Sequence, residues 1–277
     1  MKLYRTSAGI VLQKDEQIRL STHTNWDAYI NRDDLLAQAE TDFADARPQT
    51  AHWLSQQTML APIQSQEVWA SGVTYLRSRD ARMEESRQAG GDTFYDKVYD
   101  AERPELFFKA TARRTVGTNG HVRIRQDSTW DVPEPELTLF ITASGRIVAY
   151  TIGNDMSSRS IEGENPLYLP QAKTYEKCAG LGPCLYVSET PLPPDTPISL
   201  RINRGGAAAF EGTITLSQMK RQLTELAGYL FRECEFPHGC FLMTGTGIVP
   251  DHPFTLQSGD EILITIEPIG TLRNLVE

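Results

Sequence analysis

Residues 133–141 read Pro133-Glu134-Pro135-Glu136-Leu137-Thr138-Leu139-Phe140-Ile141, and residues 146–155 read Arg146-Ile147-Val148-Ala149-Tyr150-Thr151-Ile152-Gly153-Asn154-Asp155. Both runs are mainly apolar, and Ser144-Gly145 between them is a turn signal. The pattern therefore predicts an antiparallel hairpin with strands over 136–143 and 146–153.

Three acidic side chains of this hairpin are predicted to meet. Glu134 and Glu136 are two residues apart, and such residues on a strand point to the same face, about 7 Å apart. Pro135 between them has no backbone N–H, which indicates a sheet edge or the start of a strand. Asp155 follows the second strand, so the hairpin returns it close to both glutamates.

These carboxylates predict a site for a divalent cation. Neighbouring carboxylates repel each other, and a bound cation is the usual means of keeping both ionised. Oxygen ligands favour Mg²⁺, or Mn²⁺ by the same hard-ligand argument. No histidine lies among Glu134, Glu136 and Asp155, which argues against zinc. A solvated acidic turn is the alternative interpretation of the glutamate pair taken alone.

Length and charge bound the class of protein. The chain has 277 residues, which suits one large domain or a domain with a small one attached. We expect a small N-terminal domain over 1–62 and the main domain over 63–277. The net charge of −9 argues against binding to nucleic acid or to an anionic membrane. Without a signal peptide or an apolar run of roughly 18 residues, the expected compartment is the cytoplasm.

The remaining pattern predicts a β-rich α+β fold. Further strands are expected at 183–188, 198–203, 208–216 and 261–267. A charged helix is expected over 78–90, and an amphipathic helix capped by Ser217 is expected to extend through Leu230. The absence of a Gly-rich phosphate-binding motif argues against a nucleotide-binding parallel sheet. The C-x5-C spacing of the cysteines does not match zinc motifs, so we expect four free thiols, mostly buried: Cys178, Cys184, Cys234 and Cys240.

Three other features are candidates for chemistry. Lys173 ends a Gly- and Pro-containing loop, where its charge would stabilise an anion or move a proton; a surface lysine is the alternative. The loop Thr244-Gly245-Thr246-Gly247 offers backbone N–H groups to a carboxylate, or is a plain tight turn. The helix over 78–90 buries little apolar surface, so it is a lid or a solvated surface helix.

These motifs together resemble the fumarylacetoacetate hydrolase family. The matching residues are Glu134-Pro135-Glu136, the run Asn154-Asp155-Met156-Ser157-Ser158-Arg159, Lys173, and Leu181-Gly182-Pro183. Leu106-Phe107-Phe108-Lys109 resembles the family's Phe-x-Lys strand, and residues 244–247 resemble its loop for the substrate carboxylate. The resemblance implies a mixed β-roll, Mg²⁺ or Mn²⁺ on the three carboxylates, and a homodimer or homotetramer. It also implies a small-molecule substrate, an α-keto acid or 1,3-diketone.

One departure from the family pattern bears on the reaction. Hydrolases of the family carry Gly-x-Asn-Tyr-x-x-His-x-x-Glu, whereas here Ser78 and Ala81 stand in the positions of His and Glu, after Gly72. Serine is no general base near neutral pH. The segments 75–85 and 162–173 instead resemble the 2-keto-3-deoxy-pentonate (arabinonate/xylonate) dehydratases of the family.

This resemblance implies a hydro-lyase of pentose catabolism that converts 2-keto-3-deoxy-D-arabinonate or -xylonate to 2,5-dioxopentanoate. Glu84 or Glu85 on the predicted lid competes with Lys173 for the proton-transfer role, and the sequence does not choose between them. The candidate substrate-binding residues are Ser78, Arg77, Arg79, Lys109, Thr244, Gly245 and Thr246. The alternatives are a C–C hydrolase of an acylpyruvate or diketo acid, an oxaloacetate decarboxylase, and a non-catalytic binder with a structural ion.

Overall fold

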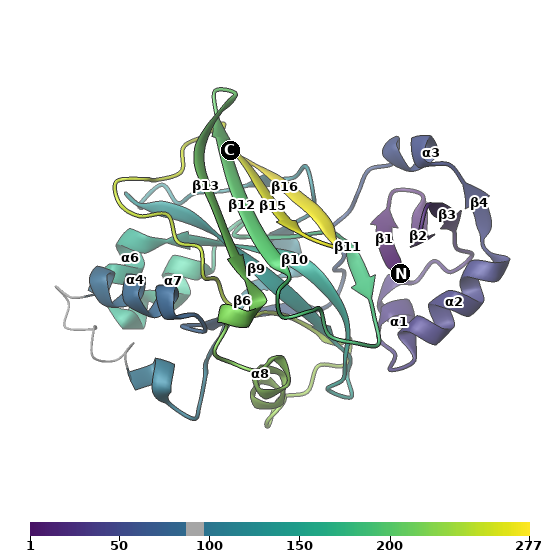
Figure 1. Cartoon of the computed structure of the whole chain (residues 1–277), viewed down its shortest axis with the longest axis horizontal. Coiled ribbons are helices and arrows are strands. Elements are labelled where there is room, and N and C mark those ends of the chain that lie inside the picture. Colours follow the sequence, from purple (N-terminus) through teal and green to yellow (C-terminus); the bar gives the residue numbers. More distant parts are fainter. Residues whose placement is uncertain (87–96) are drawn as a thin grey trace.

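The computed structural model describes residues 1–86 and 97–277, without the side chains of residues 84–86, and consists of two sheets with helices around them (Figure 1). The larger sheet has eleven strands in the order β4-β3-β2-β1-β11-β10-β9-β14-β5-β6, with β7 paired to β11. The smaller sheet has five strands in the order β13-β12-β15-β16-β8. This arrangement is a β-rich α+β fold, as the sequence predicted.

The bounds of the elements follow. The strands of the larger sheet are β1 (Lys2–Thr6), β2 (Gly9–Lys14), β3 (Gln17–Leu20), β4 (Arg47–Gln49), β5 (Glu67–Gly72), β6 (Glu105–Thr111), β7 (Thr115–Val116), β9 (Asp131–Ile141), β10 (Ile147–Ser158), β11 (Ala179–Val187) and β14 (Cys240–Met243). Those of the smaller sheet are β8 (His121–Val122), β12 (Pro197–Arg204), β13 (Ala207–Thr215), β15 (Glu261–Ile266) and β16 (Gly270–Val276). The helices include α1 (Trp26–Ile30), α2 (Leu35–Asp45), α3 (Ala51–Ser55), α4 (Leu76–Ser86), α6 (Arg159–Glu164), α7 (Leu169–Lys173) and α8 (Leu223–Leu230), and residues 97–100 are also helical. The 3₁₀ turns are η2 (Ala112–Arg114), η3 (Pro166–Tyr168) and η4 (Leu216–Gln218).

The predicted hairpin is formed by β9 and β10, and both strands are longer than the sequence indicated. Every residue of β9 is buried, because the two faces of the strand pack in different cores. Leu137, Leu139 and Ile141 join the apolar cluster that includes the smaller sheet. Phe140 packs against Phe241 in the other cluster, with ring centroids 5.1 Å apart and the rings tilted by 48°.

Pro133 and Pro135 lie in the part of β9 that is hydrogen-bonded to one neighbouring strand only. β14 pairs with β9 from Thr138 to Ile141, whereas β10 pairs along the whole strand. At Pro135 the neighbour is therefore β10 alone, which matches the expected edge or strand start.

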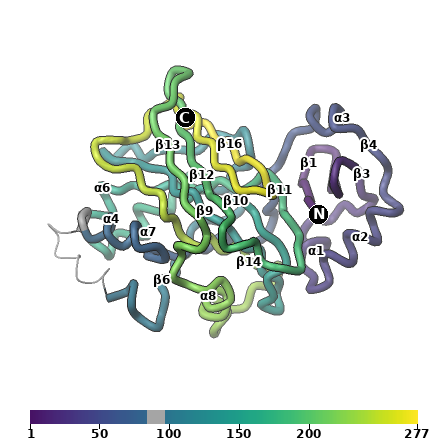
Figure 2. The backbone as a smooth tube through the Cα atoms, viewed as in Figure 1, coloured from purple at the N-terminus to yellow at the C-terminus, as the bar shows by residue number. Residues whose placement is uncertain are grey.

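The N-terminal segment continues the larger sheet. β1 pairs with β11, and β2, β3 and β4 follow it outward, at the purple end of the chain in Figures 1 and 2. Leu3 and Leu12 share an apolar cluster with Val68 and Phe140. The predicted boundary between residues 62 and 63 thus coincides with no break in this sheet, and the division into two domains stays a prediction.

The other predicted strands are present as β11, β12, β13 and β15, whereas β14 and β16 were missed. The amphipathic helix α8 begins later than predicted, so Ser217 as its cap is wrong. Met219 forms an isolated β-bridge with Tyr75, which holds the chain extended there, and Gln222 and Glu225 form the capping box instead. Within the described residues, no helix has both the length and the apolar character of a membrane span.

Candidate active site

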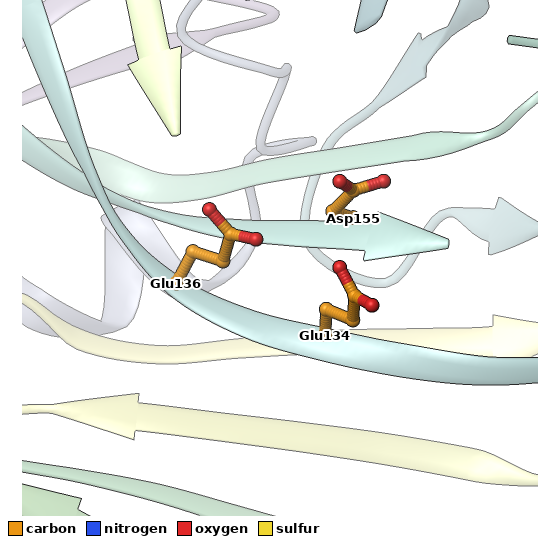
Figure 3. A group of neighbouring side chains, drawn as sticks. All are labelled: Glu134, Glu136 and Asp155. Atoms are coloured by element: carbon orange, nitrogen blue, oxygen red, sulfur yellow. The ribbon is translucent and has the colours of Figure 1, made fainter. Parts of the chain in front are cut away.

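The β9–β10 hairpin brings three carboxylates to one place (Figure 3). Asp155 on β10 pairs in register with Glu134 on β9, and Glu136 projects from the same face of β9 two residues further on. One oxygen of each carboxylate lies within 4.8 Å of the others. All three side chains are buried, so the chain has placed three acids out of reach of bulk water.

Buried cations contact two of these three carboxylates. The Nζ atom of Lys173, at the end of α7, lies 2.6 Å from Glu134 and 3.3 Å from Asp155, and donates a 2.6 Å hydrogen bond to Ser157. Lys109 on β6 lies 2.6 Å from Asp155. Two sequence-predicted lysines are therefore at the centre of the cluster rather than on the surface.

Glu136 has a different environment. Its Oε2 accepts a 2.5 Å hydrogen bond from the backbone N–H of Gly245, and no described Lys or Arg forms an ion pair with it. Burial raises its pKa well above the ordinary value, and the carboxylates of Asp155 and Glu134 raise it further. Burial also acts to raise the pKa of Glu134, but Lys173 and other nearby cations outweigh it and lower that pKa. The negative charge of the cluster is thus least compensated at Glu136.

A divalent cation fits this donor set. Three buried carboxylates, with one atom of each within 4.8 Å of the others, are the hard oxygen ligands that Mg²⁺ takes. A cation there would supply the compensation that Glu136 lacks. Two observations therefore support a metal: the poorly compensated charge of Glu136 and the close spacing of the three carboxylates.

The cavity at this cluster is narrow and polar. Its lining residues are Ser71, Gly72, Val73, Ser78, Arg82, Phe107, Glu134, Glu136, Asp155, Arg159, Lys173, Gly245 and Thr246. The lining comes from β5, β6, the β9–β10 hairpin, α4, α6, α7 and the loop after β14. The α4, α6 and α7 helices lie together beside the sheet in Figures 1 and 2.

The loop after β14 reaches the cluster through its backbone. Thr244 is held by a 2.8 Å hydrogen bond from its Oγ1 to Leu137 O, which fixes the loop to β9. Gly245 has φ +93°, and a Cβ there would lie 2.0 Å from Thr74 Oγ1. Thr246 also lines the cavity, although its hydroxyl bonds locally to Ile248. A residue other than glycine at 245 would push the loop away from Glu136.

Of the candidate site residues on α4, some line the cavity and others lie outside it. Ser78 lines the cavity, while its hydroxyl donates to Tyr75 O at 2.7 Å. Arg77 pairs with Asp251 beside a separate pocket, and Arg79 pairs with Asp80 at 2.9 Å. Neither Arg77 nor Arg79 is among the described residues of the carboxylate cavity, and their substrate-binding role stays a prediction. Glu84 and Glu85 fall in α4, but their side chains lie outside the described part of the chain.

The sequence analysis gave no site role to four charged residues of this region. Arg159 follows β10 directly and places Nη2 2.6 Å from Glu134. Arg82 on α4 forms an ion pair with Glu162 on α6, and both are buried. The i to i+4 spacing of Ser78 and Arg82 was the available signal, since it places both on one face of a helix.

Glu105 is the fourth missed residue. It begins β6 and pairs in register with Gly72, whose missing side chain makes room: a Cβ there would lie 2.0 Å from Glu105 Oε2. Burial raises the pKa of Glu105, and its Oε2 has no hydrogen-bond partner among the described residues. No sequence signal marked this glutamate, because the β5–β6 pairing alone brings it beside Gly72, which lines the cavity.

Comparison of the sequence with known proteins places this site in a family. The model of the fumarylacetoacetate (FAA) hydrolase C-terminal domain matches residues 68–277. A probable 2-keto-3-deoxyxylonate dehydratase of Haloferax volcanii is 50% identical over 216 residues, 78% of this chain and 73% of that protein. A 2-dehydro-3-deoxy-D-arabinonate dehydratase of Saccharolobus solfataricus is 45% identical over 213 residues, 76% of this chain and 72% of that protein.

Solved structures of dehydratases match this chain over its whole length. A structure of 2-keto-3-deoxyarabinonate dehydratase superposes with a TM-score of 0.88 at 36% identity, covering 100% of this chain and 99% of that chain. A structure of 2-keto-3-deoxy-D-arabinonate dehydratase complexed with magnesium and 2,5-dioxopentanoate has a TM-score of 0.85 at 35% identity, with the same coverage. The chain therefore belongs to the fumarylacetoacetate hydrolase family.

Proposed function

We propose that this protein is a magnesium-dependent dehydratase that removes one water from a 2-keto-3-deoxypentonate and yields 2,5-dioxopentanoate. The observation that carries the proposal is the buried triad of Glu134, Glu136 and Asp155 in a chain 50% and 45% identical to proteins named as dehydratases of such acids. Ser78 and Ala81 stand where the family's hydrolases have a water-activating His and Glu, which favours dehydration over C–C hydrolysis.

Glu134, Glu136 and Asp155 are the residues that would hold the cation. When bound, Mg²⁺ polarises the keto group of the substrate and makes the C3 protons more acidic. Arg159 and Lys173 fix the orientation of Glu134, and Lys109 fixes Asp155. The backbone N–H of Gly245 fixes Glu136. Glu134, Glu136 and Asp155, which we call the acidic wall, are thus held in place to receive the cation and the keto-acid end of the substrate.

Lys173 suits the stabilisation of negative charge better than the removal of a proton. Burial acts to lower its pKa, but Asp155 and Glu134 outweigh it and raise the pKa above that of a free lysine. Its ammonium is therefore retained at neutral pH and lies close to where the substrate oxygens would be. We infer that Lys173 holds the charge that develops on the keto oxygen when C3 loses its proton.

Glu105 is the best-placed described group for the proton transfer. It is a buried carboxyl with an unpartnered oxygen beside Gly72, which lines the cavity, and its raised pKa makes it a stronger base than an exposed glutamate. We infer that Glu105 accepts the C3 proton and passes it to the C4 hydroxyl, which leaves as water. The resulting enone, 5-hydroxy-2-oxopent-3-enoate, then tautomerises to 2,5-dioxopentanoate. Glu84 and Glu85 on α4 remain the competing assignment.

The assembly and compartment belong to the same proposal. We infer a homodimer or homotetramer in the cytoplasm, on the strength of the family resemblance and of the acidic composition without an apolar span. Light scattering coupled to size-exclusion chromatography measures the assembly. A monomer at micromolar concentration contradicts this part of the proposal without affecting the reaction.

Mass spectrometry of a 2-keto-3-deoxypentonate incubated with the protein tests the reaction. We expect loss of one water with Mg²⁺ and none with a chelator. The Glu136→Ala variant under the same conditions is the control for contaminating activity. Failure with both C4 epimers, together with cleavage of an acylpyruvate, would establish C–C hydrolysis instead.

A further inference from the structure

One wall of the cavity that holds the acidic triad is formed by α4. Ser78 and Arg82 lie one helical turn apart, line the cavity, and are 7% and 4% exposed. The Ser78 hydroxyl is engaged with the backbone of Tyr75, so Arg82 is the charged group that α4 brings to this space. Guanidinium groups donate hydrogen bonds from a planar fork and accept none, so this wall is built to meet oxygen atoms of a ligand.

Glu162 holds Arg82 in this position. The ion pair joins α4 to α6, and Glu162 is 1% exposed. A buried arginine is strongly unfavourable without such a partner, and a pair fixed on two helices keeps the fork in one orientation. α6 starts at Arg159, which contacts Glu134, so the pair is also tied to the metal-binding wall.

The two walls differ in the substrate atoms that they suit. A 2-keto-3-deoxypentonate carries its carboxylate and keto oxygens on C1 and C2, and its hydroxyls on C4 and C5. The acidic wall with a bound cation suits the first pair. The C4 and C5 hydroxyls then face the remaining polar groups of the cavity. Among the cavity-lining residues of α4, Arg82 is the permanently charged donor.

We propose that Arg82, oriented by Glu162, is the specificity-determining residue that binds the C4 or C5 hydroxyl of the substrate and so selects a hydroxylated acid over a plain α-keto acid. This inference rests on the proposed function. Glu162 acts through Arg82 and is a positioning residue.

A pair of ligands separates this role from a merely structural one. The hydroxylated substrate reports binding at both walls, whereas 2-oxopentanoate has the same carbon chain without the C4 and C5 hydroxyls and reports the acidic wall alone. We expect Arg82→Gln to raise KM for the hydroxylated substrate tenfold or more. The inhibition constant of 2-oxopentanoate should stay within twofold of the wild-type value at saturating Mg²⁺.

Three variants complete the design. Arg82→Lys keeps the positive charge but loses the planar guanidinium, so its KM should lie between the values of wild type and Arg82→Gln. If Arg82→Gln fails to fold, Arg82→Lys still tests the role of the guanidinium. Glu162→Gln should raise KM in the same direction without changing inhibition by 2-oxopentanoate. Arg201→Gln, which removes an exposed Arg–Glu pair on β12, is the matched control and should behave as wild type.

The outcomes distinguish the two proposals. Equal weakening of both ligands in Arg82→Gln and Arg82→Lys, or unchanged kinetics in both, would overturn the role of Arg82 and leave the dehydratase proposal standing. Absence of water loss by the wild-type protein with Mg²⁺ would overturn both. A rise in KM confined to the hydroxylated substrate supports both.

Discussion

Asp155 and Glu134 stand directly opposite each other on antiparallel strands, and Lys173 bridges them with contacts of 3.3 and 2.6 Å. Glu136, two residues along β9, pairs in register with Gly153 and shares neither this lysine nor another described cation. The three metal-binding candidates are thus unequal before any metal binds. This asymmetry gives variants at the three positions different expected effects.

Glu136→Gln should separate metal binding from stability. The variant keeps an oxygen for the Gly245 N–H and removes the carboxyl whose charge the folded state compensates least. We expect a Tm in chelator at or above that of wild type, together with the loss of the Tm increase that Mg²⁺ gives. Thermal unfolding with and without Mg²⁺ measures both, and an unchanged Mg²⁺ effect would remove Glu136 from the ligand set.

Lys173→Met should impair turnover much more than metal binding. The substitution removes an ammonium from beside the substrate oxygens, for which losses of about 10²–10³ in kcat are typical. Mg²⁺ affinity should not fall, because the carboxylates lose a competing cation. Calorimetric titration with Mg²⁺ and steady-state kinetics give the two values. Lys177→Met, at an exposed ion pair with Glu277, is the control.

Glutamine variants should identify the proton acceptor. We expect Glu105→Gln to lower kcat by about 10²–10⁴ while Mg²⁺ binding is unchanged, as for loss of a general base. Exchange of the C3 protons with deuterium, followed by NMR, should be lost in the same variant. If exchange persists in Glu105→Gln and disappears in Glu84→Gln or Glu85→Gln, the base lies on α4.

Gly245→Ala should destabilise the protein and displace the loop from Glu136. A Cβ at 245 would meet Thr74 Oγ1 at 2.0 Å and Ser71 O at 2.9 Å, at a backbone φ of +93°. We expect a loss of about 3 kcal/mol in the free energy of unfolding. Gly228→Ala in α8 has open space around the new Cβ and should instead gain about 0.5–1 kcal/mol. Urea unfolding of both variants compares them, and equal effects would contradict the clash.

Asp131 should make stability depend on pH. Burial raises its pKa to about 6, so the folded state holds this proton more tightly than the unfolded state, and stability falls as pH rises from about 4 to 6. Asp131→Asn should remove that loss and raise the free energy of unfolding above pH 6 by up to about 3 kcal/mol. The gain should vanish at pH 4. Urea unfolding in chelator at both pH values measures it, with the exposed Asp195→Asn as control.

The triad was predictable from sequence because it depends on local geometry. Alternation along β9 places Glu134 and Glu136 on one face, and the turn after β9 returns Asp155 on β10. The lysines followed from the family motif. The signals in the hairpin lie within a short stretch of chain, where spacing determines which side chains meet.

The remaining parts of the site depend on contacts between distant segments. Glu105 lies beside the cavity-lining Gly72 through pairing of β6 with β5, and Arg82 meets Glu162 by packing of α4 on α6. β14 lies between β5 and β9, parallel to one and antiparallel to the other, although nearly a hundred residues separate it from β9 in the chain. Hydrophobic periodicity carries no information about such partners, so these residues appeared only with the tertiary structure.

The two faces of β9 divide its residues between folding and chemistry. Leu137, Leu139 and Ile141 serve one core, while Glu134 and Glu136 project from the opposite face. Substrate preference is assigned to Arg82 on α4, which belongs to neither sheet. Substitutions confined to α4, in evolution or in a laboratory library, could thus change the substrate while the hairpin and its metal-binding carboxylates stay unchanged.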